Sequence, residues 1–193
     1  MRDSLRITPA ACITAALLLL LLPLNWLLAA AFAACFHELC HYAALRLCGV
    51  RPRQLRIGTN GAVMETDALS YGKELLCALA GPLGSFILLL TAGWFPRLAV
   101  CAAFHALYNL LPLYPLDGGR ALHCGAMLLL PPKAAEIVCS VSGKLCLSAI
   151  SVAALYCTFV LDLGLLPILM AMLLLAKRQK TKIPCKPGRL GVQ

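Results

Sequence analysis

The sequence predicts an all-α polytopic membrane protein, with about six transmembrane helices and a re-entrant, β-hairpin-like segment after the second helix. Of the 193 residues, 61% are hydrophobic and only 13% are charged, and the mean hydropathy is +0.86. Soluble domains are about half apolar and about a quarter charged, which excludes an ordinary soluble domain. A chain of this length has room for about six spans of about 20 residues each and little else.

The first predicted span covers residues 7–28 and follows a basic N-terminus, MRDSLR. Together with the alanine-rich stretch behind it, this run imitates a secretory signal peptide. Cleavage near Ala34 would remove a packing partner from the helix bundle and would leave the polar motif of the next span at a new N-terminus. We therefore interpret residues 7–28 as the first span.

The second predicted span covers residues 29–48 and ends at Gly49, where a glycine can cap the helix. The stretch that follows, residues 55–65, contains Asn60-Gly61 between two short apolar-containing strands, which is the strongest short hairpin signal. This segment either presents a strand edge to an extended polypeptide or is a surface loop that only turns the chain. Asn60 and Gly61 are accordingly candidate substrate-binding residues under the first interpretation.

The third predicted span covers residues 75–95, in which Gly81 and Ser85 stand four apart and permit close approach of another helix. A fourth span begins at about Leu98 and runs into residues 108–120, where two prolines and two glycines must break the helix. Irregular backbone at membrane depth is tolerated only where it is buried in protein or lines a cavity. We expect such surroundings for this broken segment.

A short amphipathic segment, residues 121–133, precedes two further predicted spans, residues 141–160 and 163–176, which are divided at Asp162-Leu163-Gly164. A basic tail, residues 177–193, is predicted to be disordered and cytoplasmic. The chain is thus expected to comprise one membrane domain and this tail. The domain covers residues 1–176, with its core motifs in residues 30–120.

The basic residues predict the orientation. Apart from Arg97 and Lys144, the 17 Lys and Arg residues fall at the N-terminus, the second-to-third and fourth-to-fifth connections, and the C-terminus. By the positive-inside rule both ends of this multi-pass, bacterial-type membrane protein are cytoplasmic. Lys144 can snorkel if the fifth span starts there.

The net charge of +9 does not indicate a nucleic-acid partner, because the basic residues form no separate domain. The acidic and basic residues before the third span are interpreted as solvated charges: Glu65, Asp67, Lys73 and Glu74.

One polar stretch, His37-Glu38-Leu39-Cys40-His41, interrupts the apolar second span. Positions four apart share one face of a helix, so the two imidazoles can hold one metal ion. Glu38 can then reach a water bound to that ion. This spacing is typical of zinc metalloproteases, with two His ligands and a Glu general base. Ionisable groups are costly at membrane depth, so they occur there mainly when function requires them.

A catalytic zinc needs a third protein ligand, and Asp117 is the natural candidate because it is an acid at matching depth on the broken segment. We predict one Zn²⁺ per chain, held by His37, His41 and Asp117. Glu38 would take a proton from water and pass it to the leaving amine. The amide of Asn109 could hydrogen-bond the oxyanion or the substrate backbone.

The eleven cysteines contain no CxxC pair and are interpreted as small packing residues.

These motifs resemble those of the site-2 protease family of intramembrane zinc metalloproteases. The resemblance covers roughly residues 30–120 and rests on HELCH, on Gly81-Pro82-Leu83, and on the downstream motif Asn109-x-x-Pro112-x-x-Pro115-Leu116-Asp117-Gly118. It implies the same zinc ligands, a catalytic Glu38, and regulated cleavage of a transmembrane or membrane-associated protein within the bilayer. The six-span layout looks most like the bacterial stage IV sporulation protein FB, which processes a membrane-associated pro-sigma factor. Ser85 departs from the Asn that the family often has there, and neither a CBS nor a PDZ domain is expected.

Two other classes of protein stay open. A membrane zinc or ion transporter would also place His and Asp at the bilayer midplane, but it would need polar residues on both sides of the site, which residues 26–36 lack. A catalytically silent membrane assembly partner would not need Glu38. The partners considered are a membrane-associated protein substrate and a membrane regulatory protein.

Overall fold

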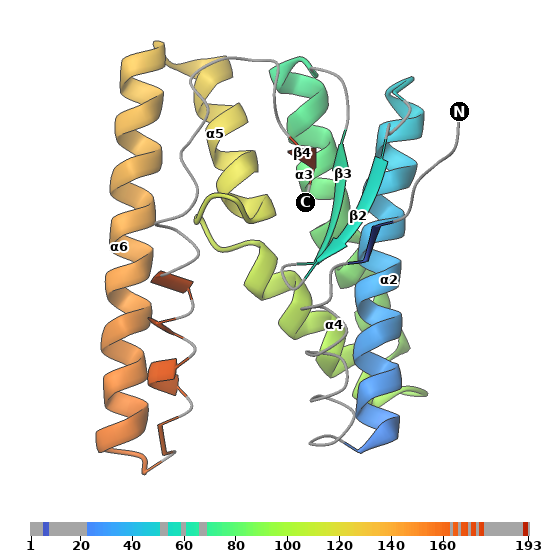
Figure 1. The fold of residues 1–193 in the computed structure, drawn as a ribbon, viewed down its shortest axis with the longest axis vertical. Helices are drawn as coiled ribbons and strands as arrows, with labels where there is room; N and C mark the ends of the chain where they lie inside the picture. The colour runs from blue at the N-terminus through green and yellow to red at the C-terminus, as the bar shows by residue number, and fades with distance from the viewer. Residues whose placement is uncertain are drawn as a thin grey trace.

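The chain is mostly helical in the computed structural model (Figure 1). The structure describes residues 6–7, 23–50, 54–58, 61–65, 69–162, parts of 164–175, and 191–192. Its main helices within these ranges are α2 (Leu24–Leu47), α3 (Tyr71–Ile87), α4 (Pro96–Asn109), α5 (Asp117–Leu129) and α6 (Pro132–Phe159), and the 3₁₀ helix η1 (Leu88–Thr91) continues α3.

Three described stretches are long and apolar enough to cross a membrane: Leu24–Leu47, Tyr71–Thr91 and Pro132–Phe159. By contrast, α4 and α5 have 14 and 13 residues. Each is therefore about 20 Å long, less than the ~30 Å hydrocarbon core of a bilayer. The span predicted from about Leu98 is thus a helix too short to cross the hydrocarbon core on its own. The six-span count remains a prediction, because much of the first and sixth predicted spans lies outside the described residues.

The helix α2 starts after a proline and ends in a glycine cap. Pro23 precedes the first turn, where the helix has no use for a backbone donor. At the other end Gly49 has a φ of +77°, and the amides of Gly49 and Val50 donate to the carbonyls of Arg46 and Leu45, each at 3.0 Å. These two bonds form a Schellman motif, which confirms the predicted glycine end of this helix.

Three predicted boundaries are wrong. Residues 24–28 belong to α2 rather than to a preceding span. The helix α6 begins at Pro132 instead of near residue 141, because a proline is accepted in the first turn of a helix. Lys144 consequently lies exposed in mid-helix and does not mark the start of a span. The helix α5 begins at Asp117, so both glycines of the broken segment lie in its first turn and the break is confined to residues 110–116.

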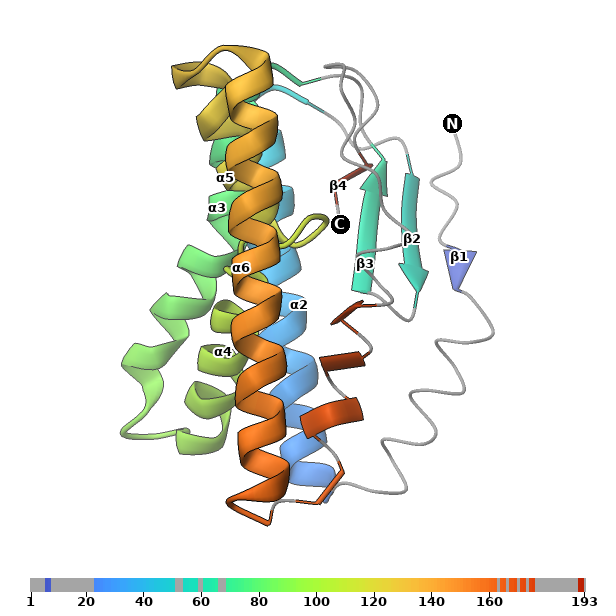
Figure 2. The same ribbon diagram turned by 90° about the vertical axis from the view of Figure 1, so that its left-hand side faces the viewer.

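The short helices α4 and α5 follow one another along the long direction of the molecule, with the break between them (Figures 1 and 2). The helix α3 packs against α2, α4 and α5, and α5 also packs against α6. The break folds back onto α5 closely: a Cβ at Gly118 would collide with the carbonyl of Leu110, and one at Gly119 with the backbone of Leu113. The two glycines therefore permit the break by letting the chain pass over the start of α5.

Small residues occupy many of the described helix contacts, while many large apolar side chains point outward. Buried positions include Ala102, Ala135 and Cys77, whereas Leu129 is 84% exposed and Trp94 is 80% exposed. Small residues let membrane helices approach closely, and extensive exposed apolar surface is typical of a protein that meets lipid. The burial of Cys77, Cys124 and Cys139 confirms their interpretation as packing residues.

Four short strands form a sheet in the order β1-β2-β3-β4 at one side of the helices (Figure 2). The strands β2 (Gln54–Gly58) and β3 (Gly61–Glu65) pair antiparallel, with Gly58 opposite Gly61. The outer edges of this pair are met by β1 (Arg6–Ile7) and β4 (Gly191–Val192). Asn60 lies outside the described residues, and the re-entrant position of this segment in a membrane remains a prediction.

Candidate metal centre

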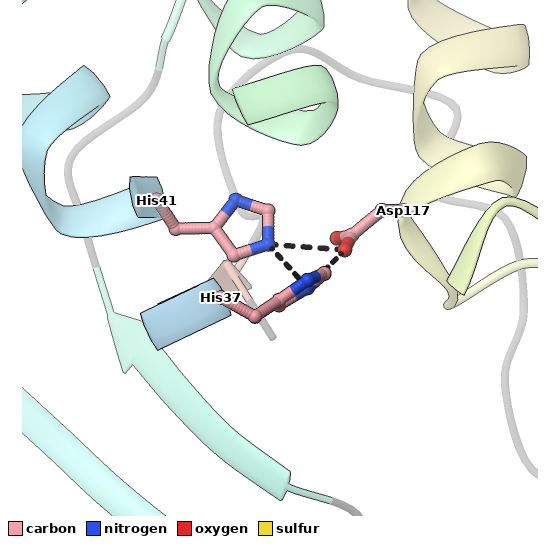
Figure 3. Close-up of side chains that lie close together, drawn as sticks. All are labelled: His37, His41 and Asp117. Carbon is pink, nitrogen blue, oxygen red and sulfur yellow. Dashed lines mark hydrogen bonds and ion pairs between the residues drawn. The ribbon is translucent and has the colours of Figure 1, made fainter. Parts of the chain in front are cut away.

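Two helices bring a pair of histidines and a carboxylate together (Figure 3). His37 and His41 lie one turn apart on α2, and Asp117 is the first residue of α5. The two Nε2 atoms are 3.1 Å apart, and each lies 3.0 Å from Oδ2 of Asp117. All three side chains are buried, and their ligand atoms lie within 4.8 Å of one another. The three predicted ligands thus meet although Asp117 is 80 residues from His37 in sequence.

The hydrogen bonds behind the imidazoles indicate which ring nitrogens face the centre without a proton. Nδ1 of His41 lies 2.7 Å from the carbonyl oxygen of Cys77, which can only accept, so Nδ1 carries the proton. In the neutral ring Nε2 then presents a lone pair to the centre. Nδ1 of His37 lies 2.9 Å from Oγ of Ser85, which can accept a hydrogen bond from an Nδ1–H group in the same way.

This donor set fits a divalent cation. Two imidazole lone pairs and a carboxylate oxygen converge on one buried point, and without a positive charge between them such a group would be repulsive. Two His nitrogens and one carboxylate oxygen are ligands that catalytic zinc takes, with a further position left for water or substrate. A backbone carbonyl behind a liganding imidazole is also usual at zinc sites, because it fixes the tautomer.

Residue 81 has no side chain where the two imidazoles meet α3. A Cβ at Gly81 would collide with Nε2 of His41 and would lie 2.7 Å from Nε2 of His37. The predicted close approach of a helix at this position is thereby confirmed. Ser85 lies one turn further along the same face, and its bond to His37 is a role that the sequence motif does not reveal. The four-residue spacing from Gly81 is the signal that places it there.

Glu38 is half-buried beside the three ligands, and the charges of His41 and Asp117 act on it. Its Oε2 is buried and accepts no hydrogen bond from any group in the described part of the chain. A buried carboxylate oxygen without a donor is a costly feature. It leaves an acceptor available for a proton from water at the centre, as a general base requires.

The other predicted substrate-binding residues are differently placed. Asn109 ends α4, and its Nδ2 donates to the backbone carbonyl of His105 at 3.1 Å, so its amide would have to leave this bond to reach an oxyanion. Gly61 opens β3. His105 itself packs edge-on against the ring of His37, with 4.5 Å between ring centroids, and lies outside the group of three ligands.

A buried ion pair lies behind Asp117. Nη2 of Arg120, on α5, is 3.3 Å from Oε1 of Glu74 on α3, and Nη1 is 3.6 Å from Oδ1 of Asp117. The prediction that Glu74 is a solvated interface charge is wrong, because α5 packs against this face of α3 and covers the carboxylate. Counting Arg120 among the basic residues of an interspan connection is wrong for the same reason. The sequence offers no signal for this pair beyond the arginine that follows Asp117-Gly118-Gly119.

Fold and site together define a helical protein with membrane-spanning character and a buried His-His-Asp group. No protein-family model matches the chain. A zinc metalloprotease of Methanocaldococcus jannaschii is 32% identical over 100 residues, a match that covers 45% of this chain and 30% of that protein. The chain therefore spans about a third of the length of this curated relative.

Among solved structures, the site-2 protease from Methanocaldococcus jannaschii is similar with a TM-score of 0.60, and the match covers 93% of each chain at 19% sequence identity. At that identity the likeness shows a shared fold. The sequence match and the fold match thus point to relatives of one kind, zinc metalloproteases and site-2 proteases.

Proposed function

We propose that this chain is an intramembrane zinc endopeptidase of the site-2 protease family, which cleaves a transmembrane or membrane-associated protein within or near the bilayer. The observation that carries the proposal is the buried convergence of His37, His41 and Asp117, with Oε2 of Glu38 beside it, which has no hydrogen-bond partner among the described residues. The zinc metalloprotease relative and the site-2 protease fold support the same class. Pro-sigma-factor processing is a narrower form of this proposal that rests on sequence resemblance alone.

Different residues of the chain would serve different steps of peptide-bond hydrolysis. A zinc ion held by the three ligands would polarise the scissile carbonyl and lower the pKa of a bound water towards ~7. Glu38 accepts a proton as water adds to the carbonyl carbon, and it returns that proton to the amine as the C–N bond breaks. One water is consumed for each bond cleaved. The Cys77 carbonyl and the Ser85 hydroxyl keep the imidazoles oriented throughout.

The substrate must reach the site in an extended form. Peptide bonds inside a helix are hydrogen-bonded and shielded, so a helical substrate has to unwind locally. We assign the β2–β3 segment to holding the unwound strand, by addition of a strand at its edge. Because β1 and β4 pair with the outer edges of β2 and β3, an incoming strand would displace one of them. Water and substrate would meet on the cytoplasmic side, if the basic residues set the orientation as predicted.

Metal analysis of the wild type beside Asp117→Ala, both purified without chelators, tests the site. We expect one zinc per chain in the wild type and a loss of zinc in the variant, since two imidazoles alone form an incomplete site. Full zinc in Asp117→Ala would place the third ligand elsewhere and would contradict the proposal. Absence of zinc from both proteins would favour the silent assembly partner.

Glu38→Gln separates catalysis from metal binding. The amide keeps the shape of the side chain but cannot take up a proton, so cleavage of an end-labelled, single-span model substrate should fall by at least about 100-fold while zinc content stays unchanged. Cleavage by this variant at the wild-type rate would rule out Glu38 as the general base. An ion transporter would instead move zinc into proteoliposomes, and the wild type should show no such uptake.

A further inference from the structure

The ion pair between Glu74 and Arg120 has no part in the chemistry described above. Glu74 is 3% exposed and Arg120 is 1% exposed, and they come from different helices, α3 and α5. Burying two charges removes their hydration, and apolar residues of similar volume often stabilise a fold equally well. Packing alone therefore does not account for this pair.

The two oxygens of Asp117 have different surroundings. Oδ2 faces both imidazoles at 3.0 Å, whereas Oδ1 lies 3.6 Å from Nη1 of Arg120. Arg120 stands three residues after Asp117, so both side chains leave α5 on one face. In the described part of the chain Nη1 completes no hydrogen bond, which leaves the ion pair with Asp117 as its polar contact.

We propose that Arg120, held in place by Glu74, is a positioning residue that fixes Asp117 as a one-oxygen metal ligand. The planar guanidinium can face two carboxylates at once, which an ammonium group does less well. With Oδ1 turned to Arg120, only Oδ2 would be left to bind a metal, and a position for water would stay open. This inference rests on the proposed function, because it assigns a role towards the same metal.

Glu74 supplies the charge balance that this arrangement needs. Arg120 and a zinc ion would otherwise place three positive charges around the single carboxylate of Asp117. A buried like-charge cluster of that kind is unfavourable in a medium of low polarity. The carboxylate of Glu74, on α3, neutralises the guanidinium of Arg120 and also fixes its position against α3, through the contact at 3.3 Å.

The test replaces both partners together. Removing one alone would leave an unpaired buried charge and could prevent folding. The double variant Glu74→Leu with Arg120→Met keeps apolar volume at the helix contact. Its matched control, Lys133→Met with Glu136→Leu, removes one positive and one negative charge from exposed positions of α6.

Zinc affinity is measured by competition with a chromophoric chelator, and Co²⁺ is then bound in place of zinc to record its visible absorption. We expect the double variant to bind zinc about 10- to 100-fold more weakly than the wild type. We also expect an altered Co²⁺ spectrum, because Asp117 becomes free to bind through both oxygens. The control should match the wild type in both measurements.

These measurements distinguish failure of the positioning role from failure of the proposed function. Wild-type zinc affinity and an unchanged Co²⁺ spectrum in the double variant would overturn the positioning role while leaving the proposed metalloprotease intact. A wild type that binds no metal would overturn the proposed function itself, and with it this inference. Should the double variant fail to fold, Arg120→Lys gives the answer: weaker zinc binding with a changed spectrum supports the proposal, and unchanged values contradict it.

Discussion

Three residues of α3, each four positions apart, surround the two histidines of α2 on the side that faces α3. Cys77 offers its backbone carbonyl to His41, Gly81 offers space to both rings, and Ser85 offers its hydroxyl to His37. Residues four apart lie on one face of a helix, so this stripe is a single surface fitted to the imidazoles. The HELCH motif supplies two candidate ligands, and this stripe of α3 determines which way their ring nitrogens face.

Substitution of Gly81 should therefore weaken metal binding. In Gly81→Ala the new methyl group would occupy the position of the ligand nitrogens, and zinc affinity should fall by at least about 10-fold in chelator competition. The matched control is Gly72→Ala, at the start of the same helix, where a Cβ would have no atom within 4 Å. Equal zinc affinity in Gly81→Ala and Gly72→Ala would show that the approach of the two helices is less tight than described here.

Single residues were predictable from the sequence to different degrees. His37, Glu38 and His41 form a local pattern that helix periodicity alone places on one face, and Asp117 is marked by its charge in an apolar surrounding. Glu74 and Arg120 escaped prediction because their pairing depends on how α3 packs against α5. In the sequence alone, Glu74 and Arg120 cannot be told apart from solvated charges near helix ends.

At the scale of elements, the break between α4 and α5 is the feature that delivers the carboxylate. A continuous helix through residues 96–129 would carry Asp117 in its middle, with its side chain set by helix periodicity. The break makes Asp117 the first residue of a new helix, where a carboxylate is favoured by the unpaired amides and by the helix dipole. The prolines of the motif predicted this break, but both glycines had a different purpose, which is to let the chain cross over α5.

Gly118→Ala tests that purpose. The added methyl group would meet the carbonyl of Leu110, and we expect the free energy of unfolding to fall by about 1–3 kcal/mol, as for other overpacked sites. On the same helix Gly125→Ala has open space and should be neutral or stabilising by up to about 1 kcal/mol. Denaturation followed by circular dichroism in detergent compares the two. Equal stability of the two variants would contradict the described course of the break.

The ends of helices show why other elements were misplaced. The glycine end of α2 could be predicted, since the Schellman motif is a local arrangement of adjacent residues. The starts of α5 and α6 could not be placed from hydropathy, because each helix begins with polar or proline residues outside the apolar run. A window that follows apolar residues finds the middle of a helix better than its first turn.

For the whole molecule, the distribution of side chains is the reverse of that in a soluble protein. Large apolar groups cover the described exterior, and the ionisable groups of the centre are buried together. Such an interior gains little from the hydrophobic effect once the exterior meets lipid, so small residues and polar contacts must hold the helices together. A metal that joins α2 to α5 would add directly to this stability.

Zinc should consequently stabilise the folded state, in addition to its proposed role in catalysis. Binding only to the folded state adds about 2.7 kcal/mol at a free zinc concentration 100 times the dissociation constant. The melting temperature of the wild type in detergent should rise with added zinc and fall after a chelator, whereas that of Asp117→Ala should respond to neither. A wild-type melting temperature that does not change with added zinc would show that the metal does not bind the folded chain.

The separation of the ligands along the chain also bears on biosynthesis. A nascent polypeptide that has emerged as far as α3 already carries both histidines and Glu38, but not the carboxylate from α5. Until α5 is made and docks against α3, the ribosome-bound chain has no complete centre. Under the proposed function, a protease assembled in this order would stay inert among newly inserted membrane proteins until α5 has been made.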